Sequence, residues 1–563
     1  MPACDGFVGA LLCASVNWIT NAGLVVVVLA IAWAKPKLGR QWIIPLERLW
    51  RKLTHHTGWS LLILALGGFF LCVTINLLIG LYPPWGHDAY GYLLAADTFA
   101  QGRLTNPPHP LWQHFETFHT IHQPTYASKY PPLQGAILAL GQIIGHPHIG
   151  VWLATAGAAL AVVWMLRAWI PARWAWLGGM LVLLHPVTLL WGTWYFGGTL
   201  AMTAGALVIG AWRRLVDHRH PKPAAAWWLG IGIASLANCR PFEGLVLTLA
   251  TGCVWVWSCR WRDLWRTALV LTLAGLWMGY YNWRITGTPG RLPYHVYEQQ
   301  YGVAPLLLWE KPQPIPTYRH AVMREFHLGW DWHLYQKQQT LAGWLEVSRD
   351  KLRTYLAGAF PMDLFGTPVL YALALAAAIC AAWRRAWMPA VVLVLILFTL
   401  GLLASSWYNL HYAAPGFPLV VLIVVQGLRY LRALRKRGRL LAFLLIISAV
   451  ITGVTAAGLL ARSEPTKFQR DRAAVIAKLK KTGGNHLVIV RYSATHNPDD
   501  EWVFNGADID RSPIIWAREL EPSELLKYYS DRHIWLLEPD AEPFRLNSLT
   551  SNPPSSTNPY NGK

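Results

Sequence analysis

Apolar blocks long enough to cross a lipid bilayer are the feature that most constrains how this chain can fold. Several windows of about 18 to 24 residues carry almost no charge, and about 20 apolar helical residues span a hydrocarbon core of about 30 Å. Charged residues make up only 14% of the 563 residues, whereas soluble proteins have about 25%. Many of the 33 Trp residues stand at block edges, as in an interfacial aromatic belt. The sequence therefore predicts an α-helical polytopic membrane protein.

The spanning segments and the charge of their connections predict an orientation. We predict about twelve transmembrane helices, at 16–34, 59–82, 148–166, 174–191, 198–214, 225–239, 243–259, 267–283, 364–383, 388–406, 415–431 and 440–461. Six connections are basic: 35–52, 167–173, 213–222, 260–266, 384–385 and 429–439. Because Lys and Arg favour the cytoplasmic side, these six connections predict that both termini lie outside. We expect a multi-pass protein of the inner (plasma) membrane.

This orientation leaves three large pieces outside the membrane and defines the predicted domains. They are the outer loops 83–147 and 284–362 and the tail after 461, and the short apolar run 131–144 reads as an interfacial helix. In the tail, helices at 473–481 and 522–529 and strands at 486–490 and 534–537 predict a small α/β extracytoplasmic domain. The predicted units are an N-terminal helix with a basic loop (1–58), a membrane core (59–461), the α/β domain (462–546) and a disordered tail (547–563).

Composition also argues against several classes of function. The net charge of +20 lies in short runs between apolar blocks, which favours orientation signals over nucleic-acid binding. The seven Cys residues form no C-x-x-C motif, so no disulfide framework or metal knuckle is indicated. We find no phosphate-binding or dinucleotide fingerprint for a soluble nucleotide. Five acidic residues in the tail lack the spacing of a calcium loop and predict a solvated surface: Asp499, Asp500, Glu501, Asp508 and Asp510.

Candidate chemistry lies at the two ends of the first outer loop. The loop opens with Trp85-Gly86-His87-Asp88 and closes with Ser128-Lys129-Tyr130-Pro131-Pro132-Leu133. A carboxylate at the membrane boundary can act as a general base or as a ligand of a divalent cation. A lysine on a backbone stiffened by two prolines can hold a lipid-linked phosphate. The structural alternatives are that Asp88 caps the following helix and that Lys129 extends to the interface.

These two motifs resemble the C-type glycosyltransferase superfamily, in particular its protein O-mannosyltransferase and lipid A aminoarabinose transferase group. The resemblance covers about Thr57 to Arg214. It implies a multi-helix membrane core that transfers a sugar from a polyprenyl-phosphate donor to an acceptor outside the cytoplasm. The family's loop carboxylate is matched by Asp88, which implies a catalytic base or a metal-linked role. Its lysine before the prolines is matched by Lys129, which implies contact with the donor phosphate.

The sequence departs from the family pattern at three points. Asp88 is followed by Ala89 where many relatives have Glu, and Tyr130 separates Lys129 from the prolines. The short loop at 191–202 carries no carboxylate, which argues against a two-carboxylate metal site. No cofactor is specified, and a divalent metal stays open.

Further site residues are predicted on the same outer face. Glu243 can replace the missing acid and Arg240 can clamp phosphate, or these two residues pair with each other. We predict that the donor phosphate is bound by Lys129, Tyr130 and Arg240, with acid or substrate contacts from His87, Glu243, His411 and Tyr412. The second large loop adds aromatic and basic residues suited to sugar and phosphate: Arg284, Arg291, Tyr294, His295, Tyr297, Arg319, His320 and Arg324.

Three functions fit these features. The first is an inverting hexosyl- or pentosyltransferase that moves a sugar from a polyprenyl-phosphate donor to an extracytoplasmic lipid, glycan or protein, with membrane lipid as its surroundings. The second is a transporter or flippase of a lipid-linked sugar, although ionisable residues within helix centres and internal repeats, which would support it, are scarce. The third is a membrane scaffold whose tail binds a partner. The concentration of ionisable groups on one face favours the enzyme.

Overall fold

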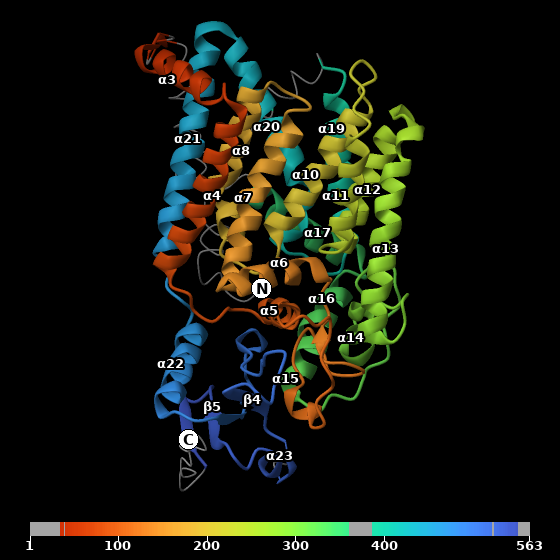
Figure 1. The fold of residues 1–563 in the computed structure, drawn as a ribbon, viewed down its shortest axis with the longest axis vertical. Coiled ribbons are helices and arrows are strands. Elements are labelled where there is room, and N and C mark those ends of the chain that lie inside the picture. The colour runs from red at the N-terminus through yellow and green to blue at the C-terminus, as the bar shows by residue number, and fades with distance from the viewer. Residues whose placement is uncertain are drawn as a thin grey trace, which may run out of the picture.

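The computed structural model describes residues 34–35, 37–38, 40–359, 376, 385–520 and 523–549. Within these residues the fold is mostly helical, with a bundle along the long axis and smaller elements gathered beyond one end of it (Figure 1). The bundle contains α4 (Thr57–Ile79), α7 (Pro147–Leu166), α8 (Ala172–Leu183), α9 (Pro186–Trp191), α10 (Gly198–Leu215), α11 (Ala225–Ala237), α12 (Pro241–Trp255), α13 (Trp265–Thr286), α19 (Met388–Leu402), α20 (Phe417–Ala433) and α21 (Arg435–Ala461).

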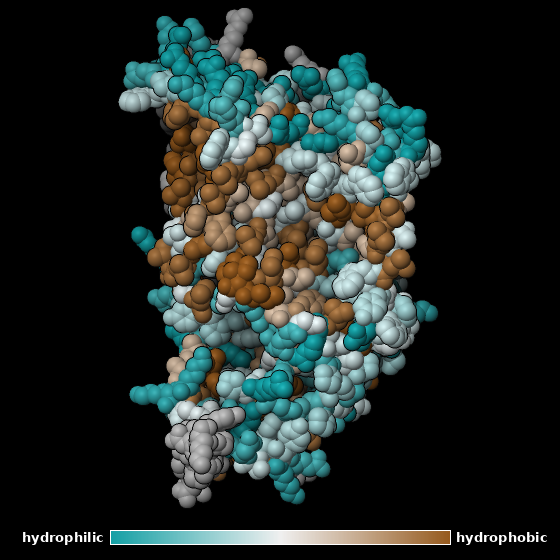
Figure 2. All heavy atoms as spheres, viewed as in Figure 1, coloured by the Kyte–Doolittle hydropathy of each residue, from teal (hydrophilic) through white to brown (hydrophobic). Residues whose placement is uncertain are grey.

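The apolar character of the bundle fits a membrane environment. Among the described residues, four helices are long and apolar enough to cross a bilayer: Thr57–Ile79, Pro147–Leu166, Leu410–Ala433 and Gly438–Ala461. Figure 2 shows apolar side chains over the upper and middle part of the molecule and hydrophilic side chains at both ends. The total of about twelve spans stays a prediction, since the segments 16–34 and 364–383 lie almost wholly outside the described residues.

One predicted span is wrong as a single helix. The segment 174–191 is divided into α8 and α9, because Pro186 lacks a backbone N–H and disfavours helical backbone at the residue before it. His185 fills the break, and its Nδ1 accepts a hydrogen bond from the backbone N–H of Val187 at 3.3 Å. The other predicted spans that lie within described residues coincide with helices to within a few residues.

All six basic connections lie at one end of the bundle. Helix α3 (Arg40–Leu53) also lies at this end, at the upper left of Figure 1. Trp50 Nε1 donates to the carbonyl of Arg173 at 3.2 Å, and Arg432 forms two hydrogen bonds of 2.8 Å with Glu47. The charge pattern therefore predicted correctly which connections share an end. That this end faces the cytoplasm stays a prediction.

The opposite end holds the first and second outer loops. The first contains α5 (His87–Ala100), the short hairpin of β1 (Thr120–Ile121) and β2 (Ala127–Ser128), and α6 (Pro132–Ile144). Helix α6 coincides with the run 131–144 that was predicted as an interfacial helix. The second contains α14 (Pro293–Tyr301), α15 (Ala321–Arg324), a π-helix (Glu325–Asp331), α16 (Trp332–Lys337) and α17 (Leu341–Ala359). Short 3₁₀-helices lie at 112–115, 256–258, 261–263, 410–416 and 498–500.

The tail forms a four-stranded sheet beside helix α22 (Lys467–Thr482). The strand order is β4 (Ile514–Arg518), β3 (His486–Val490), β5 (His533–Glu538) and β6 (Arg545–Ser548), with α23 (Ser523–Tyr528) between β4 and β5. The first three strands are parallel and β6 is antiparallel to β5. The predicted strands at 486–490 and 534–537 are confirmed. The predicted disorder is wrong at residues 547 and 548, which pair in β6, and residues 550–563 lie outside the described part of the chain.

The tail shares a hydrophobic core with the first outer loop. Leu94, Phe115 and Tyr126 of the loop pack in one cluster with Leu487 and Ile515 of the sheet. The tail is further tied by Gln469, whose Nε2 donates to the carbonyl of residue 83 at 2.8 Å. The domain boundary near residue 462 stays a prediction. Such a boundary would separate two segments that bury apolar side chains against each other.

Candidate functional site

A tight turn positions the start of α5 at the mouth of the outer loops. Gly86 has a φ of 85°, a left-handed conformation that glycine adopts without a Cβ clash. Helix α5 begins at the next residue, and Asp88 therefore stands in its first turn. Because the N-cap position is Gly86, the alternative prediction that Asp88 caps this helix is wrong.

The Asp88 carboxylate is held by three side chains and open on one side. The Tyr130 hydroxyl donates a hydrogen bond to Oδ1. His119 Nε2 lies 3.6 Å from Oδ1, and His87 Nδ1 lies 3.6 Å from Oδ2. The Asp88 side chain is 43% exposed, whereas the His87 and His119 side chains are 9% and 6% exposed. The protein thus orients the carboxylate and leaves part of it accessible to a substrate.

The two histidines form a hydrogen-bonded pair beside Asp88. His87 Nδ1 and His119 Nε2 are 2.6 Å apart, so the two rings share one proton. Burial lowers the pKa of His87, but Asp499, 3.4 Å from its Nε2, and Asp88 hold this pKa above its ordinary value. Burial, with the charges of Lys129 and His87, holds the pKa of His119 well below its ordinary range. The two pKa shifts run in opposite directions, so His87 holds a proton more readily than His119.

The same three residues are a candidate metal-ligand set. One ligand atom each from His87, Asp88 and His119 lies within 4.8 Å of the others. Two imidazoles and a carboxylate suit zinc or another borderline divalent metal. Two nitrogens bound to one tetrahedral zinc lie about 3.3 Å apart, given Zn–N bonds of about 2.0–2.1 Å. The imidazoles, at 2.6 Å, would have to part slightly to take up the ion. The set fits a metal in its donor types, with one carboxylate instead of two.

Lys129 lies beside this cluster in a cage of rings. Its Nζ is 3.1 Å from Glu298 Oε1, 4.3 Å from the ring centre of Tyr297 and 4.9 Å from that of Tyr294. The residue is only 7% exposed, so the alternative prediction that it extends freely to the interface is wrong. The structure thus offers a buried cation whose present counter-ion is a carboxylate. Binding of a phosphate there stays a prediction.

Arg240 reaches the same region from the start of α12. Its Nη2 donates to the Phe196 carbonyl at 3.0 Å, and its guanidinium lies 5.3 Å from the ring centre of Tyr412. Among the described residues no ion pair of 4 Å or less joins it to Glu243, which is buried in the first turn of α12. His411 is buried against Phe196, with ring centres 5.4 Å apart. Arg240, His411 and Tyr412 therefore do come together.

The second outer loop contributes only part of its predicted residues to this region. Tyr294 and Tyr297 flank Lys129. Arg319 and His320 instead bind Glu116, at 3.2 and 3.3 Å. Their role within the described structure is to join the first and second outer loops.

Three residues of this cluster were not assigned to it from the sequence: His119 and Glu298 were left out, and Asp499 was predicted to lie on a solvated surface. His119 carries no motif, and its φ of 59° in the structure is unusual for a residue other than glycine. Glu298 lies 169 positions after Lys129, and Asp499 lies in the tail. No local pattern could connect these residues with Asp88, because the contacts depend on how three separate segments pack.

The predicted solvated acidic surface of the tail is wrong in part. Asp499 faces His87 with a side chain only 19% exposed. Glu501 is 1% exposed and forms an ion pair of 2.6 Å with Arg518. Asp510 accepts a hydrogen bond of 2.5 Å from Tyr529 but keeps a side chain that is 47% exposed, as predicted for a solvated surface. Burial explains the difference for Asp499 and Glu501, since buried carboxylates are normally paired.

The fold is similar to that of solved structures. No protein-family model matches the sequence, and no curated protein matches it. Crystal structures of ArnT from Cupriavidus metallidurans, in the apo state and bound to undecaprenyl phosphate, align with 86% of this chain and 93% of their own, with a TM-score of 0.51 at 13% and 14% identity. AglB, an oligosaccharyltransferase of Archaeoglobus fulgidus, aligns with 77% of this chain and 62% of its own at 11% identity, and its TM-score of 0.44 is too low to support an inference. The chain has the C-type glycosyltransferase fold, as the sequence resemblance predicted.

Proposed function

We propose that this protein is a membrane glycosyltransferase that moves a sugar from a polyprenyl-phosphate donor to an extracytoplasmic lipid, glycan or protein. The observation that carries the proposal is the partly exposed Asp88 carboxylate, which three side chains orient at the same end of the bundle as the cations Lys129 and Arg240. The ArnT structure with undecaprenyl phosphate supports the class of donor, since it has the same fold. The site then faces the outside of the inner membrane.

In the proposed reaction Asp88 acts as general base. The acceptor hydroxyl gives its proton to Asp88 while its oxygen forms a bond to the anomeric carbon of the sugar. The bond from that carbon to the phosphate oxygen breaks, and its electron pair leaves with the polyprenyl phosphate. Attack from the face opposite the phosphate inverts the anomeric configuration. Charge develops on the departing phosphate, where Lys129 and Arg240 stabilise it.

The surrounding residues prepare Asp88 for this step. Tyr130 fixes the direction of the carboxylate, and His87 and His119 each place a ring nitrogen 3.6 Å from one of its oxygens. A divalent metal held by His87, Asp88 and His119 would supply Lewis-acid activation. Acceptance of the proton by Asp88 needs the carboxylate lone pair that now faces solvent, which its 43% exposure provides.

The test is consumption of radiolabelled sugar from a panel of polyprenyl-phosphate donors by purified protein. We expect Asp88→Asn to lower turnover by at least about 100-fold, because general-base catalysis contributes about 10²–10⁴. Asp531→Asn, an exposed change in the tail, serves as the matched control and retains activity. Near-normal transfer by Asp88→Asn would remove this residue from the mechanism. Donor that moves across a vesicle membrane without being consumed would instead support the transporter.

A further inference from the structure

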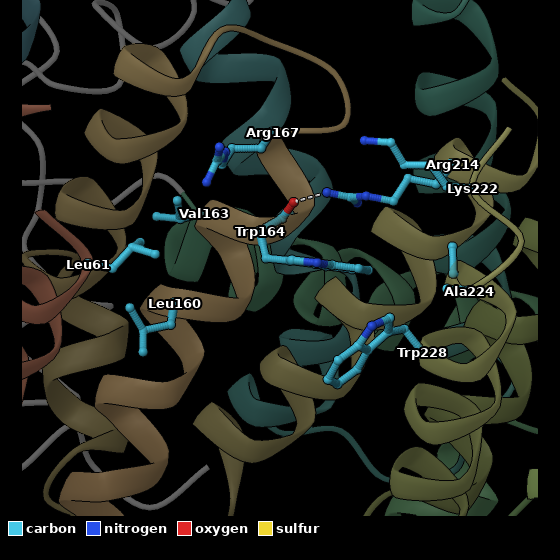
Figure 3. Close-up of a pocket in the computed structure, with 10 residues that line it drawn as sticks. Leu61, Leu160, Val163, Trp164, Arg167, Arg214, Lys222, Ala224 and Trp228 are labelled. Carbon is cyan, nitrogen blue, oxygen red and sulfur yellow. Dashed lines mark hydrogen bonds between the residues drawn. The ribbon is translucent and has the colours of Figure 1, made fainter. Parts of the chain in front are cut away.

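A second cationic cavity lies at the basic end of the bundle, remote from Asp88. It has a volume of about 420 Å³ and lies between α4, α7, α10 and α11 (Figure 3). Its wall combines apolar side chains (Leu61, Leu160, Val163), two tryptophans (Trp164, Trp228) and three cations (Arg167, Arg214, Lys222). No acidic residue lines it among the described residues.

Arg214 is built into this cavity rather than loosely placed on its rim. Its Nη2 donates to the carbonyl of Trp164 at 2.7 Å and its Nη1 to that of Gly210 at 2.8 Å. The guanidinium also stacks over the Trp164 ring, 3.9 Å from the ring centre. These contacts leave its positive charge without a carboxylate partner among the described residues.

Arg167 and Lys222 add two further positive charges to the wall of the cavity, beside that of Arg214. Both are exposed, and among the described residues neither has a carboxylate within 4 Å, whereas Arg432 at the same end pairs with Glu47. Arg167 lies close enough to Arg214 for the two charges to repel. Like charges held together without an anion are unfavourable, so an anion from outside would be stabilised here.

A neighbouring cavity extends this group of positive charges. It has a volume of about 280 Å³ and shares Arg167, to which it adds Arg385 and Arg429. The two cavities together are lined by cations from α10 and α20 and from the connections after α7, after α10 and before α19.

We propose that the cavity of Trp164, Arg167, Arg214, Lys222 and Trp228 binds the phosphate headgroup of an anionic membrane lipid. The cations would hold the phosphate, and the apolar wall of Leu61, Leu160 and Val163 would receive the start of an acyl chain. Basic pockets between transmembrane helices are suited to anionic headgroups. Trp228 is 44% exposed, a placement typical of the interfacial belt.

The site is independent of the proposed sugar transfer. Helix α7 runs from Pro147, beside the outer loops, to Leu166, beside the cavity, and its 20 residues rise about 30 Å. The cavity and Asp88 thus lie at opposite ends of the bundle. A lipid bound here would belong to the leaflet at the basic end, not to the donor site.

The test measures lipid binding to the full chain in detergent by native mass spectrometry. Phosphatidylglycerol is titrated against phosphatidylcholine, and inorganic phosphate is added separately. We expect retained phosphatidylglycerol adducts, and the double variant Arg167→Gln/Lys222→Gln to bind about 30-fold more weakly, since each cation near a headgroup contributes about 1 kcal/mol. Both side chains are exposed, so the variant should remain folded.

Its matched control is Arg219→Gln/Arg262→Gln, two exposed cations at the same end that do not line the cavity. We expect the control to bind phosphatidylglycerol as the wild type does. Equal adducts with phosphatidylcholine, or equal loss in both double variants, would overturn the proposal. If inorganic phosphate at the same concentration as the lipid abolished the adducts, the ligand of the cavity would be a free phosphate and the lipid proposal would be overturned.

Discussion

The Lys129 ammonium can be buried because nearby protein groups replace the favourable interactions that it would have with water. Glu298 supplies an opposite charge at 3.1 Å, and the faces of Tyr294 and Tyr297 supply ring electrons. If the donor phosphate binds this ammonium, it must compete with the Glu298 carboxylate. Substitutions at the two positions should therefore act in opposite directions.

We expect Lys129→Met to raise the donor KM at least about tenfold, since a hydrogen bond to a charged group contributes about 1.5–3 kcal/mol. Glu298→Gln should lower the donor KM, because the amide keeps the shape of the side chain and leaves the ammonium charge unneutralised. Both constants come from donor titrations at saturating acceptor. A donor KM that is unchanged in Lys129→Met would assign this lysine to packing alone.

Tyr130 fixes the direction of the Asp88 carboxylate through its hydroxyl. Tyr130→Phe removes that hydrogen bond and keeps the ring, which stacks on Tyr92 with ring centres 4.2 Å apart. We expect turnover to fall about tenfold or more, because hydrogen bonds to charged groups contribute about 1.5–3 kcal/mol, with a smaller effect on the donor KM. The exposed Tyr82→Phe is the control. A loss confined to the KM would place Tyr130 on the donor phosphate, as the sequence suggested.

Among the elements, the close approach of α5 to the second strand of the hairpin sets the geometry of the site. A Cβ at Gly91 would lie 2.9 Å from the Tyr130 ring, and a Cβ at Gly135 would lie 2.6 Å from Ala95. Glycine thus allows α5 to lie against both the residue that follows β2 and helix α6. Asp88 and Tyr130 can meet only because these elements come this close.

We expect Gly91→Ala to push the Tyr130 ring away and to cost about 1–3 kcal/mol of stability by overpacking, with turnover reduced at least as much as in Tyr130→Phe. Gly67→Ala, in α4, is the matched control: nothing lies within 4 Å of its added Cβ. Measurements of turnover and of thermal unfolding on both variants test this expectation. Normal turnover in Gly91→Ala would show that the ring can shift without consequence for the site.

At the scale of the whole molecule, buried carboxylates join the three outer segments. Glu116 of the first loop accepts from Tyr301 at 2.8 Å and pairs with Arg319, both of the second loop. Arg518 of the tail donates to the Glu116 carbonyl at 2.5 Å and pairs with Glu501. The network thus joins the first outer loop both to the second outer loop and to the tail.

This network should be sensitive to acid. Burial raises the pKa of Glu501, but Arg518 and the Tyr492 hydroxyl outweigh it and hold this pKa below its ordinary value of 4.5. His320 and Tyr301 likewise outweigh burial and lower the pKa of Glu116. A carboxyl with a lowered folded pKa contributes stability above pH 4.5 and loses it as the pH falls through the folded pKa. We expect hydrogen exchange of β3 and β4, corrected for its intrinsic rate, to increase below pH 4.5 while α4 stays protected.

A variant isolates the contribution of Glu501. Glu501→Gln leaves Arg518 buried without its counter-ion and should destabilise the tail by about 3–5 kcal/mol at neutral pH. The control is Glu464→Gln, because the Glu464 side chain is 90% exposed. Equal protection of β4 in the two variants would exclude Glu501 as a link between the tail and the loops.

The sequence by itself determined most of the described helices of the bundle and the end at which their connections lie. Length and apolar character fixed α4, α7 and α21, since a spanning helix must satisfy its own backbone hydrogen bonds. The charge of the connections fixed their common end, and the motifs at Asp88 and Lys129 indicated the fold. These signals are local, so they can be read along the chain. The break at Pro186 is also local and was readable, but the apolar run hid it.

Only the tertiary structure decided which side chains meet at Asp88. His119 lies just before the hairpin, Glu298 in a helix of the second loop and Asp499 in the tail. They reach His87 or Lys129, which lie around Asp88, only because these segments pack together. The same packing buries Glu501, which in sequence looks like part of a solvated acidic run. Burial and distance are properties of the packed fold. A sequence therefore records that an ionisable residue is present, and the tertiary structure decides which partner sets its charge.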